Sequence, residues 1–451
     1  MTSPFRKTAV ALVVLAGLAA YAYFVDSKKP AKDEKPKEKV FGFERAKAKE
    51  LRLLPAGTDA IRLVKEVSGW RLTAPSAAPA DGEAVDSILS SLESLEIEAV
   101  VTDSASALAD FGLEPPKLAV EWAIEGQTEP LTLLLGDAAP AGDGIYAKLP
   151  AAPRVFTLPA YLEGSFNKKP FDLRDRSVLH VKRDDVRSLQ IGGPEGSFSL
   201  AKDQAGDWAF VAPLKTRAGR WTVDGLVGNL ESLRMDEVAA EEAKDLKPFG
   251  LDKPVRTVSL GLGDGTNKRL EIGSSPKDKS YHARDAASRL VVVIPGALVD
   301  DLAKGMKELR AKRLYEVATY EVEGFEVEVE GGKRAFAKST TKDKDGVDTP
   351  KWKKTAPETK DLDTNKVQDA LFAIGGVEAQ EFVDSPKDPA NYGLDRPALK
   401  VNLRFAGGKP AAWFEVGQKD GAYHARRLGD EAILKLDAAK AEGLLKSFKE
   451  L

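Results

Sequence analysis

The sequence predicts an α+β fold that is repeated three times in tandem, each copy a mostly antiparallel sheet with packed helices. Two motifs that move together along the chain support this prediction. A tryptophan four residues before Ala-Pro recurs after 138 and then 144 residues, at Trp70, Trp208 and Trp352. An aromatic-Gly-Leu motif recurs in step, after 138 and then 143 residues. The spacing indicates domain-sized repeats of about 135 to 140 residues, each long enough to bury its own core.

Composition agrees with folded domains and excludes several kinds of chemistry. The chain has 451 residues, which is typical of about three domains. It contains no cysteine, so disulfides, thiolate metal sites and a cysteine nucleophile are excluded. A formal net charge of −3 with both signs dispersed gives no basic face for nucleic acid.

The N-terminus predicts a membrane anchor. Residues 8–25 are uncharged over 18 residues, which as a helix would span about 27 Å. A cleaved signal peptide is the alternative, because Ala20-Tyr21-Ala22 has the small-x-small form. We favour the anchor because the apolar run continues beyond that site. Residues 1–7 then form a short tail, and the Lys/Glu/Pro-rich residues 26–43 a flexible tether.

The orientation of this anchor is predicted from two opposing arguments. Six lysines follow the span and only two basic residues precede it, so charge counting alone places the C-terminal domains in the cytoplasm. A seven-residue tail before a single anchor usually stays inside, and large domains cross the membrane regardless of charge. We therefore expect a single-pass protein of the bacterial inner membrane with its repeat domains in the periplasm.

Within each repeat, alternating apolar and charged residues predict half-buried strands. We place the repeat domains at residues 44–181, 182–316 and 317–451. The opening strands are expected to align through these apolar positions: Leu51 and Leu53, Leu189 and Ile191, Val327 and Val329. A hairpin leads to the tryptophan strand, and its turn is longer in the third copy, at residues 341–350. An amphipathic helix follows in each copy.

The aromatic-Gly-Leu motif is typical of the end of a helix. Glycine adopts the left-handed conformation without steric cost, and a proline soon after prevents the helix from continuing. We expect positive φ at Gly112, Gly250 and Gly393. The prolines that follow are Pro116, Pro254 and Pro397. Further strands close each repeat, one of them marked by Tyr146, Tyr281 and Tyr423.

A Leu-Arg segment ends the first two copies, at Arg174 and Arg310, and is missing after the third. Because it occurs only where another domain follows, we interpret it as a strap at the junction between repeats. An exposed basic helix end, favoured by the helix dipole, is an equally good interpretation.

The sequence contains no recognisable catalytic, cofactor or metal motif, and we assign no residue to these roles. His282 and His424 occupy one equivalent strand position in two repeats, so each domain would hold one histidine alone, and a metal site needs three or four ligands. The repeat tryptophans could stack on sugars, but their alternating strand context favours packing in the core or between domains. Trp221 heads the helix of the second copy and is the candidate exposed binding aromatic.

The anchor, the charged tether, the Trp strand, the aromatic-Gly-Leu-x-x-Pro turn and the Leu-Arg junction together resemble a bacterial family, domain of unknown function 4340. The resemblance covers nearly everything after the tether. It implies single-pass proteins with extracytoplasmic repeats, often encoded beside ABC-type exporters similar to gliding-motility transporter components. The family assigns no catalytic residues.

Three functions are consistent with these features. The first is a non-enzymatic, membrane-tethered scaffold or accessory protein that docks an ABC permease, its accessory subunits or another envelope complex. The second is a protein that binds envelope glycan or lipid between its domains. The third is an enzyme with an active site at a domain junction. The sequence leaves the partner and the oligomeric state open.

Overall fold

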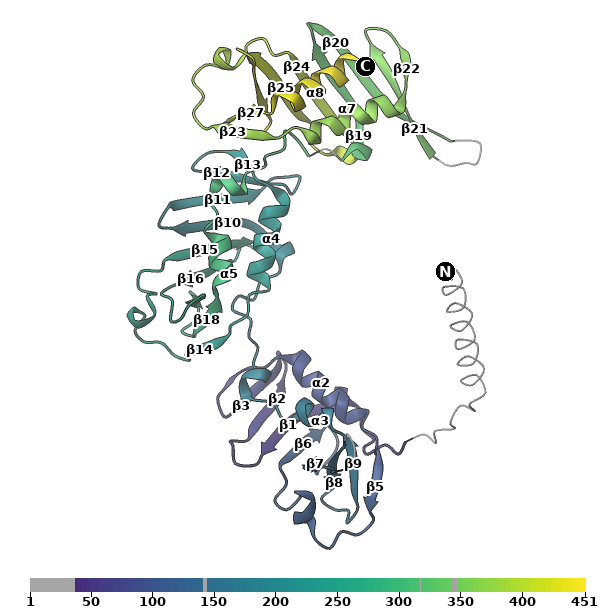
Figure 1. The fold of residues 1–451 in the computed structure, drawn as a ribbon, viewed down its shortest axis with the longest axis vertical. Coiled ribbons are helices and arrows are strands. Elements are labelled where there is room, and N and C mark those ends of the chain that lie inside the picture. Colours follow the sequence, from purple (N-terminus) through teal and green to yellow (C-terminus); the bar gives the residue numbers. More distant parts are fainter. Residues whose placement is uncertain (1–36, 141–143, 317, 343–347) are drawn as a thin grey trace, which may run out of the picture. The chain divides into compact units, whose positions relative to one another are not determined.

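The structure is a computed structural model that describes residues 37–140, 144–316, 318–342 and 348–451. It contains three antiparallel sheets of nine strands each, with helices packed on them (Figure 1). The chain divides into two compact units, Met1–Asp175 and Arg176–Leu451, and the second unit holds the second and third sheets. None of the described helices is long and apolar enough to cross a membrane. The predicted anchor, residues 8–25, lies outside the described residues.

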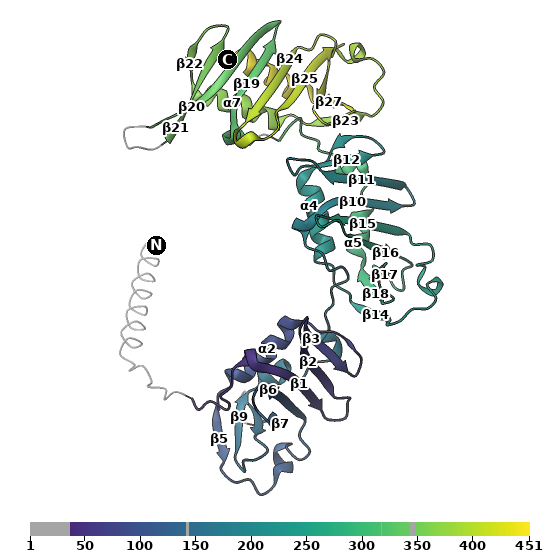
Figure 2. The same cartoon turned by 180° about the vertical axis from the view of Figure 1, so that it is seen from behind.

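All three sheets have the same strand order, shown by the first as β4-β3-β2-β1-β6-β7-β8-β9-β5. Two antiparallel meanders therefore meet where β1 pairs with β6. The main helix connects β4 to β5, which form opposite edges of the sheet, and so it must cross one face. In the third repeat, Figure 1 shows the helices in front of the strands and Figure 2 shows the strands from the other side.

The first repeat is built from these elements: η1 Arg45–Lys47, β1 Ala48–Pro55, β2 Ile61–Glu66, β3 Gly69–Ala74, β4 Ala78–Pro79, α2 Gly82–Glu93, β5 Ala99–Thr102, η2 Leu108–Phe111, β6 Leu118–Ile124, β7 Leu131–Ala138, β8 Gly144–Lys148, β9 Val155–Pro159, α3 Tyr161–Phe166 and η3 Pro170–Leu173. Helix α2 begins where the Asp81 carboxylate accepts the backbone N–H groups of Glu83 and Ala84. Its buried face consists of Val85, Ile88, Leu89 and Leu92, as the helical spacing predicted.

The second repeat has the same order: η4 Arg183–Asp185, β10 Val186–Gly193, β11 Gly196–Lys202, β12 Trp208–Ala212, β13 Thr216–Arg217, α4 Arg220–Glu231, β14 Glu237–Ala240, η5 Lys247–Phe249, β15 Arg256–Leu262, β16 Asn267–Ile272, β17 Ser280–Asp285, β18 Val291–Pro295, α5 Gly296–Leu302 and α6 Met306–Leu309.

The third repeat consists of η6 Thr319–Glu321, β19 Val322–Val329, β20 Gly332–Lys342, β21 Asp348–Ala356, β22 Lys360–Leu362, α7 Thr364–Gly376, β23 Ala379–Val383, η7 Pro389–Tyr392, β24 Leu399–Phe405, η8 Ala406–Gly408, β25 Ala412–Lys419, β26 Ala422–Arg427, β27 Ile433–Leu436 and α8 Ala438–Lys449. The predicted longer turn at residues 341–350 is corrected: residues 341 and 342 belong to β20 and residues 348–350 to β21, so the extra residues lengthen the strands of this hairpin.

The registers correct the predicted alignment of the opening strands. Leu53 lies opposite Val120, Ile191 opposite Val258 and Val327 opposite Val401. Val327 is therefore the equivalent of Leu53, and Phe325 the equivalent of Leu51. In the third repeat, the predicted alignment was two residues out of register. Side chains two residues apart point to the same face of a strand, so both alignments bury the same face.

The three turn glycines have the predicted conformation. The φ angles of Gly112, Gly250 and Gly393 are 62°, 65° and 69°. Each glycine ends a single turn of 3-10 helix and not the main amphipathic helix, because a strand separates the two. A Cβ atom on Gly250 would lie 2.7 Å from the backbone nitrogen of Ser274, so the close approach of the chain just after β16 also requires glycine.

The predicted equivalence of Tyr146, Tyr281 and Tyr423 is wrong for the first repeat. Ile145 pairs with Leu158 and Tyr281 with Ile294, so Tyr146 corresponds to His282 and His424. These three side chains pack edge-on against the aromatic residue of the turn, with ring centroids 5.0, 5.1 and 5.2 Å apart. The histidines therefore take the place of a tyrosine in a packing contact between turn and strand.

The last residues of the predicted tether belong to the first repeat. Val40 donates its backbone N–H to the Leu95 carbonyl, and Ile97 donates to the Glu38 carbonyl. Phe41 is buried, with its ring centroid 4.6 Å from that of Trp122. The predicted tether therefore extends too far at residues 38–43, because the apolar side chains at its end have a core to enter.

Candidate functional site at the junction of the second and third repeats

The motifs that recur in all three repeats form the framework of each domain. Trp70, Trp208 and Trp352 are buried, and each lies on a strand that ends before a cis Ala-Pro bond. The indole N–H of Trp208 donates to the Asp224 carboxylate at 2.8 Å, which satisfies its buried polar atom. The prolines at 116, 254 and 397 lie between the glycine turn and the following strand. These residues hold the domains together and leave the surface to other parts of the chain.

The Leu-Arg segment of the second repeat is a strap, as the first interpretation proposed. Arg310 is buried, and its guanidinium donates to the Asp384 carboxylate at 2.5 Å. The same guanidinium lies 5.0 Å from the ring centroid of Phe382. Both partners belong to the third repeat, so the side chain of Arg310 connects the two domains. Its burial excludes the alternative of an exposed helix end.

The backbone of this segment is hydrogen bonded to both repeats. On one side, Gly219 donates to the Leu309 carbonyl at 2.8 Å and Ala311 donates to the Arg217 carbonyl at 3.0 Å. On the other side, the segment continues to Leu314, which donates to the Val377 carbonyl at 2.8 Å. Residues 309–314 therefore form a continuous extended strap and not a free linker.

In the first repeat, the corresponding segment makes the same contacts with its own domain. Asp81 donates to the Leu173 carbonyl and Asp175 to the Pro79 carbonyl, both at 2.9 Å. Arg174, the other predicted junction residue, is buried and forms an isolated β-bridge with Ala80.

A buried ion pair from the third repeat closes over the strap. Arg427 donates from Nε to the Asp430 carboxylate at 2.7 Å, and both side chains are fully buried. Its other guanidinium nitrogens donate to the carbonyls of Ala311, Arg313 and Leu314. One arginine thus satisfies three strap carbonyls. We call Arg427 and Asp430 the junction lock.

Asp430 extends the junction lock into the second repeat. Its second carboxylate oxygen accepts the Thr216 hydroxyl at 3.1 Å and the Arg217 backbone N–H at 2.5 Å. Beside it, Glu431 donates its backbone N–H to the Lys215 carbonyl at 2.9 Å. A carboxylate with this many donors is well compensated for its burial. The loop between β26 and β27 therefore fixes the third repeat to β13 of the second.

The electrostatic effects of burial are clear at the lock. Burial lowers the pKa of Arg427, and the adjacent Asp430 carboxylate opposes that shift. Burial raises the pKa of Tyr315, whose ring lies 4.8 Å from the Arg217 guanidinium carbon. Both shifts result from desolvation.

A groove of about 700 Å³ lies beside the junction lock, and aromatic side chains line it. Trp221, Tyr320 and Phe372 are exposed by 75%, 76% and 78%. Trp221 comes from α4 of the second repeat, Tyr320 from η6 and Phe372 from α7 of the third. Four aromatic residues are this exposed in the described chain, and three of them line this groove. We call these three residues the aromatic rim.

The charged residues of the groove are largely paired with one another. Arg217 and Arg220 lie 3.3 and 3.7 Å from the Asp207 carboxylate. Arg313 lies 3.6 Å from Glu378. These pairs leave the groove with little net charge. The exposed aromatic rings are its main apolar surface.

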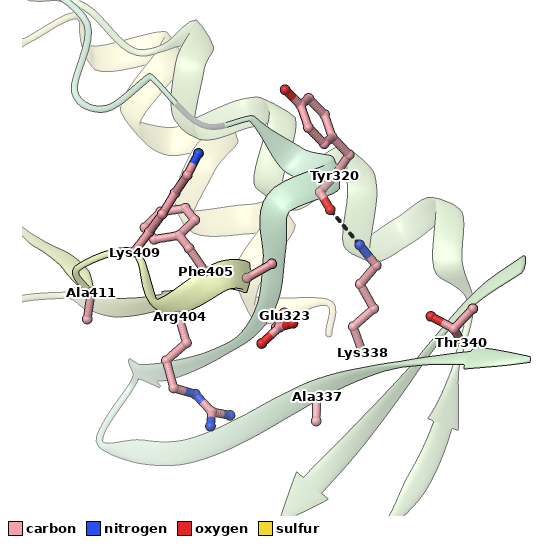
Figure 3. A pocket seen from close by; sticks show the side chains of 10 residues that line it. Tyr320, Glu323, Ala337, Lys338, Thr340, Arg404, Phe405, Lys409 and Ala411 are labelled. Carbon is pink, nitrogen blue, oxygen red and sulfur yellow. Dashed lines mark hydrogen bonds between the residues drawn. The ribbon is translucent and has the colours of Figure 1, made fainter. Parts of the chain in front are cut away.

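A second hollow of about 610 Å³ adjoins the groove within the third repeat, and Tyr320, Phe405 and Lys409 line both. Figure 3 shows the side chains of Glu323, Arg404 and Lys338 around it. Lys338 donates to the Tyr320 backbone carbonyl at 2.7 Å. The two hollows therefore form one continuous surface.

The described residues contain no group of three or more His, Cys, Asp or Glu side chains that could hold a metal ion. His282 and His424 lie against aromatic rings, and burial lowers the pKa of each.

Sequence analysis identified Trp221 and Arg310, and the structure places both at this junction. It missed Tyr320, Phe372 and the junction lock. The lock had a weak signal. After the shared Tyr-His-Ala-Arg segment the two loops have equal length but different residues, with Arg427 and Asp430 where the second repeat has Asp285 and Ser288. Tyr320 and Phe372 had none, since exposure of a single aromatic residue is not encoded in strand or helix periodicity.

The fold and this junction define a tandem α+β repeat protein. The model of the family described as Domain of unknown function (DUF4340) matches residues 70–221 and 208–397. These matches cover more than half of the chain, which therefore belongs to this family. Each match begins at a repeat tryptophan and continues past the Leu-Arg segment into the next repeat. No curated protein and no solved structure matches the chain.

Proposed function

We propose that the protein is a non-enzymatic, membrane-tethered scaffold of the bacterial envelope, with its repeats outside the cytoplasm. In this proposal, residues 8–25 form the anchor and the repeats dock a protein partner, an ABC permease or one of its accessory subunits. The family resemblance and the uncharged N-terminal segment support the location. The aromatic rim is the observation that supports docking of a partner.

Exposed aromatic side chains that gather in one place indicate a binding surface. Exposure of several aromatic rings to water is unfavourable. Burial of Trp and Tyr side chains on binding is favourable, and these residues are frequent anchors at protein interfaces. The aromatic rim draws on two repeats that the junction lock holds together, so the partner would meet a preformed surface. Because the groove charges are already paired, apolar contact is expected to supply most of the affinity.

The test is affinity purification of the full-length protein from crosslinked native membranes, followed by mass spectrometry. We expect stoichiometric recovery of an ABC permease or its ATPase. The double variant Trp221→Ala/Phe372→Ala should lose this recovery. Tyr161→Ala is the matched control, because Tyr161 is 73% exposed but lies in the first repeat. Equal recovery with all three proteins would contradict docking at the rim, and recovery of no transporter component would contradict the partner.

The second candidate is binding of an envelope glycan or lipid. Trp221 and Tyr320 favour it, because exposed aromatic faces beside hydrogen-bonding side chains also suit such ligands. Burial of the three repeat tryptophans removes them as stacking platforms. Sedimentation of the purified full-length protein with cell-wall sacculi and with lipid vesicles separates this function from the first. Binding that depends on Trp221 would favour it.

A further inference from the structure

The outer part of β20 has a strand neighbour on one side only. In the described registers, β20 pairs with β19 from Gly332 to Ala337 and with β21 from Ala335 to Lys342. Continued along the strands, this register places Ser339 opposite Val322, the first residue of β19, so Thr340–Lys342 project beyond it. In the other repeats, β2 ends at Glu66 and β11 at Lys202, shortly after their own pairing with the first strand ends. This free edge is specific to the third repeat.

The hairpin geometry determines which backbone groups face the free edge. Glu330 and Gly331 have φ angles of 51° and 76°, and Val329 lies opposite Gly332. This is a two-residue turn of the type that fits antiparallel hairpins, in which the flanking pair is hydrogen bonded. Hydrogen-bonded pairs alternate along an antiparallel ladder. The N–H and C=O groups of residues 340 and 342 therefore point toward the side that β19 leaves open, whereas residue 338 lies opposite Glu323 of β19.

The adjoining hollow lies against this edge and has an excess of positive charge. Lys338 and Arg404 line it, and neither has a carboxylate within ion-pair distance among the described residues. The third cation of the lining, Lys409, is paired with Glu321 at 2.7 Å. Glu323 is the one acidic side chain in the lining. The three projecting residues, Thr340–Lys342, extend over about 10 Å, enough to pair with a short segment of strand.

We propose that an extended, acidic polypeptide segment of a partner protein adds as a strand to the free edge of β20. Its backbone would pair with residues 340 and 342, and its carboxylates would lie near Lys338 and Arg404. Strand addition is an established way for a sheet edge to bind a peptide. The proposal rests on the proposed docking function, because the same partner would extend from the aromatic rim across Tyr320.

The charges of the edge select this occupant over a second copy of the chain. Two β20 edges brought together would place Lys338 and Lys342 of one copy close to those of the other, and lysine on an edge strand opposes such pairing. An acidic strand would instead place carboxylates beside these lysines. A helix would leave the backbone groups of the edge unpaired.

The first experiment measures fluorescence anisotropy of labelled ten-residue peptides with the purified full-length protein. The probe alternates valine and glutamate, and its two controls are the valine–lysine peptide and a valine–glutamate peptide with N-methyl groups on alternate residues. We expect each control to bind at least about tenfold more weakly than the probe. Equal binding of the N-methylated peptide would overturn strand addition. Equal binding of the lysine peptide would overturn the charge selection.

Two variants locate the site. Thr340→Pro removes the N–H that faces the edge and should weaken binding of the probe by about fivefold to tenfold, whereas Thr340→Ala should not. Since Thr340→Pro can also disturb the hairpin, a second measurement uses the absence of native cysteine. A probe that carries one cysteine should form a disulfide with Thr340→Cys and not with Val255→Cys, an exposed site in the second repeat. Equal yields at both positions would overturn the location.

The results separate this inference from the proposed function. Loss of transporter recovery in Trp221→Ala/Phe372→Ala, together with full recovery and full probe binding in Thr340→Pro, would leave the docking function standing and overturn strand addition. Probe binding that depends on residue 340, without recovery of any transporter component, would support the strand site and contradict the partner.

Discussion

The loop after the Tyr-His-Ala-Arg strand differs between the second and third repeats, although the two loops have the same length. In the second repeat, Asp285 lies 3.8 Å from Lys268, and the Ser288 hydroxyl accepts the Leu290 backbone N–H, so the loop closes on its own domain. In the third repeat, Arg427 and Asp430 occupy those two positions and bind the strap and β13 of the neighbouring domain. Tandem copies can thus keep one core and acquire a new interface by changing the residues of one loop.

The largest effect is expected from breaking the junction lock. Asp430→Ala would leave the Arg427 guanidinium buried without its counter-ion, which should lower the free energy of unfolding of the second unit by about 3–5 kcal/mol. Ser288→Ala, the matched change at the equivalent position, should cost less than about 1 kcal/mol. Urea unfolding followed by tryptophan fluorescence measures both.

The comparison becomes sharper with a loop exchange. Arg427→Asp/Asp430→Ser gives the third repeat the two residues of the second, and it removes both buried charges together. Hydrogen exchange should then accelerate at Ala311 and Leu314 while the strands of both sheets stay protected. Unchanged protection of the strap would contradict a locking role for this pair.

A smaller effect is expected where the repeats agree. Gly250→Ala places a Cβ at positive φ against Ser274 and should destabilise the protein by about 1–3 kcal/mol. Gly225→Ala, in helix α4 with no atom near its added Cβ, should instead stabilise by about 0.5–1 kcal/mol. Opposite signs in thermal unfolding would confirm that the turn requires glycine, and equal signs would contradict it.

The histidine positions predict a pH dependence that the first repeat should lack. Burial lowers the pKa of His282 and His424 in the folded protein, so as pH falls the unfolded chain binds protons first. Stability from these groups is complete above the unfolded pKa of about 6.5 and is lost as pH falls below it. His282→Tyr/His424→Tyr introduces the residue that the first repeat carries at this position, Tyr146. Its unfolding free energy should fall less between about pH 7.5 and about pH 5.5 than that of the wild type.

The smallest effect on stability is expected at the aromatic rim. Trp221 and Phe372 are exposed, so replacing both with alanine should change the free energy of unfolding by less than about 0.5 kcal/mol each. A larger loss would show that these rings pack between the repeats, and the interpretation as a binding surface would then fail. Urea unfolding of the double variant decides this before any binding experiment.

Much of each repeat could be predicted from sequence, since its signals are local. Strand alternation, the buried helix face of Val85 and its neighbours, and the left-handed glycines follow from side-chain period and backbone sterics. Errors appeared where a local signal is ambiguous. Side chains alternate along a strand, so the apolar pattern could not decide whether Phe325 or Val327 is equivalent to Leu51. Matching tyrosine to tyrosine misplaced Tyr146 by one residue.

The sequence by itself determined that the chain repeats, where the turns require glycine, and that a Leu-Arg segment marks the junctions. Only the tertiary structure showed that Arg427 meets the carbonyls of that segment, that Trp221, Tyr320 and Phe372 line one groove, and that β20 continues past its neighbour. The physical reason is distance along the chain. Periodicity and steric rules act over a few residues, whereas the lock and the groove join residues more than fifty positions apart, and only the folded chain brings them together.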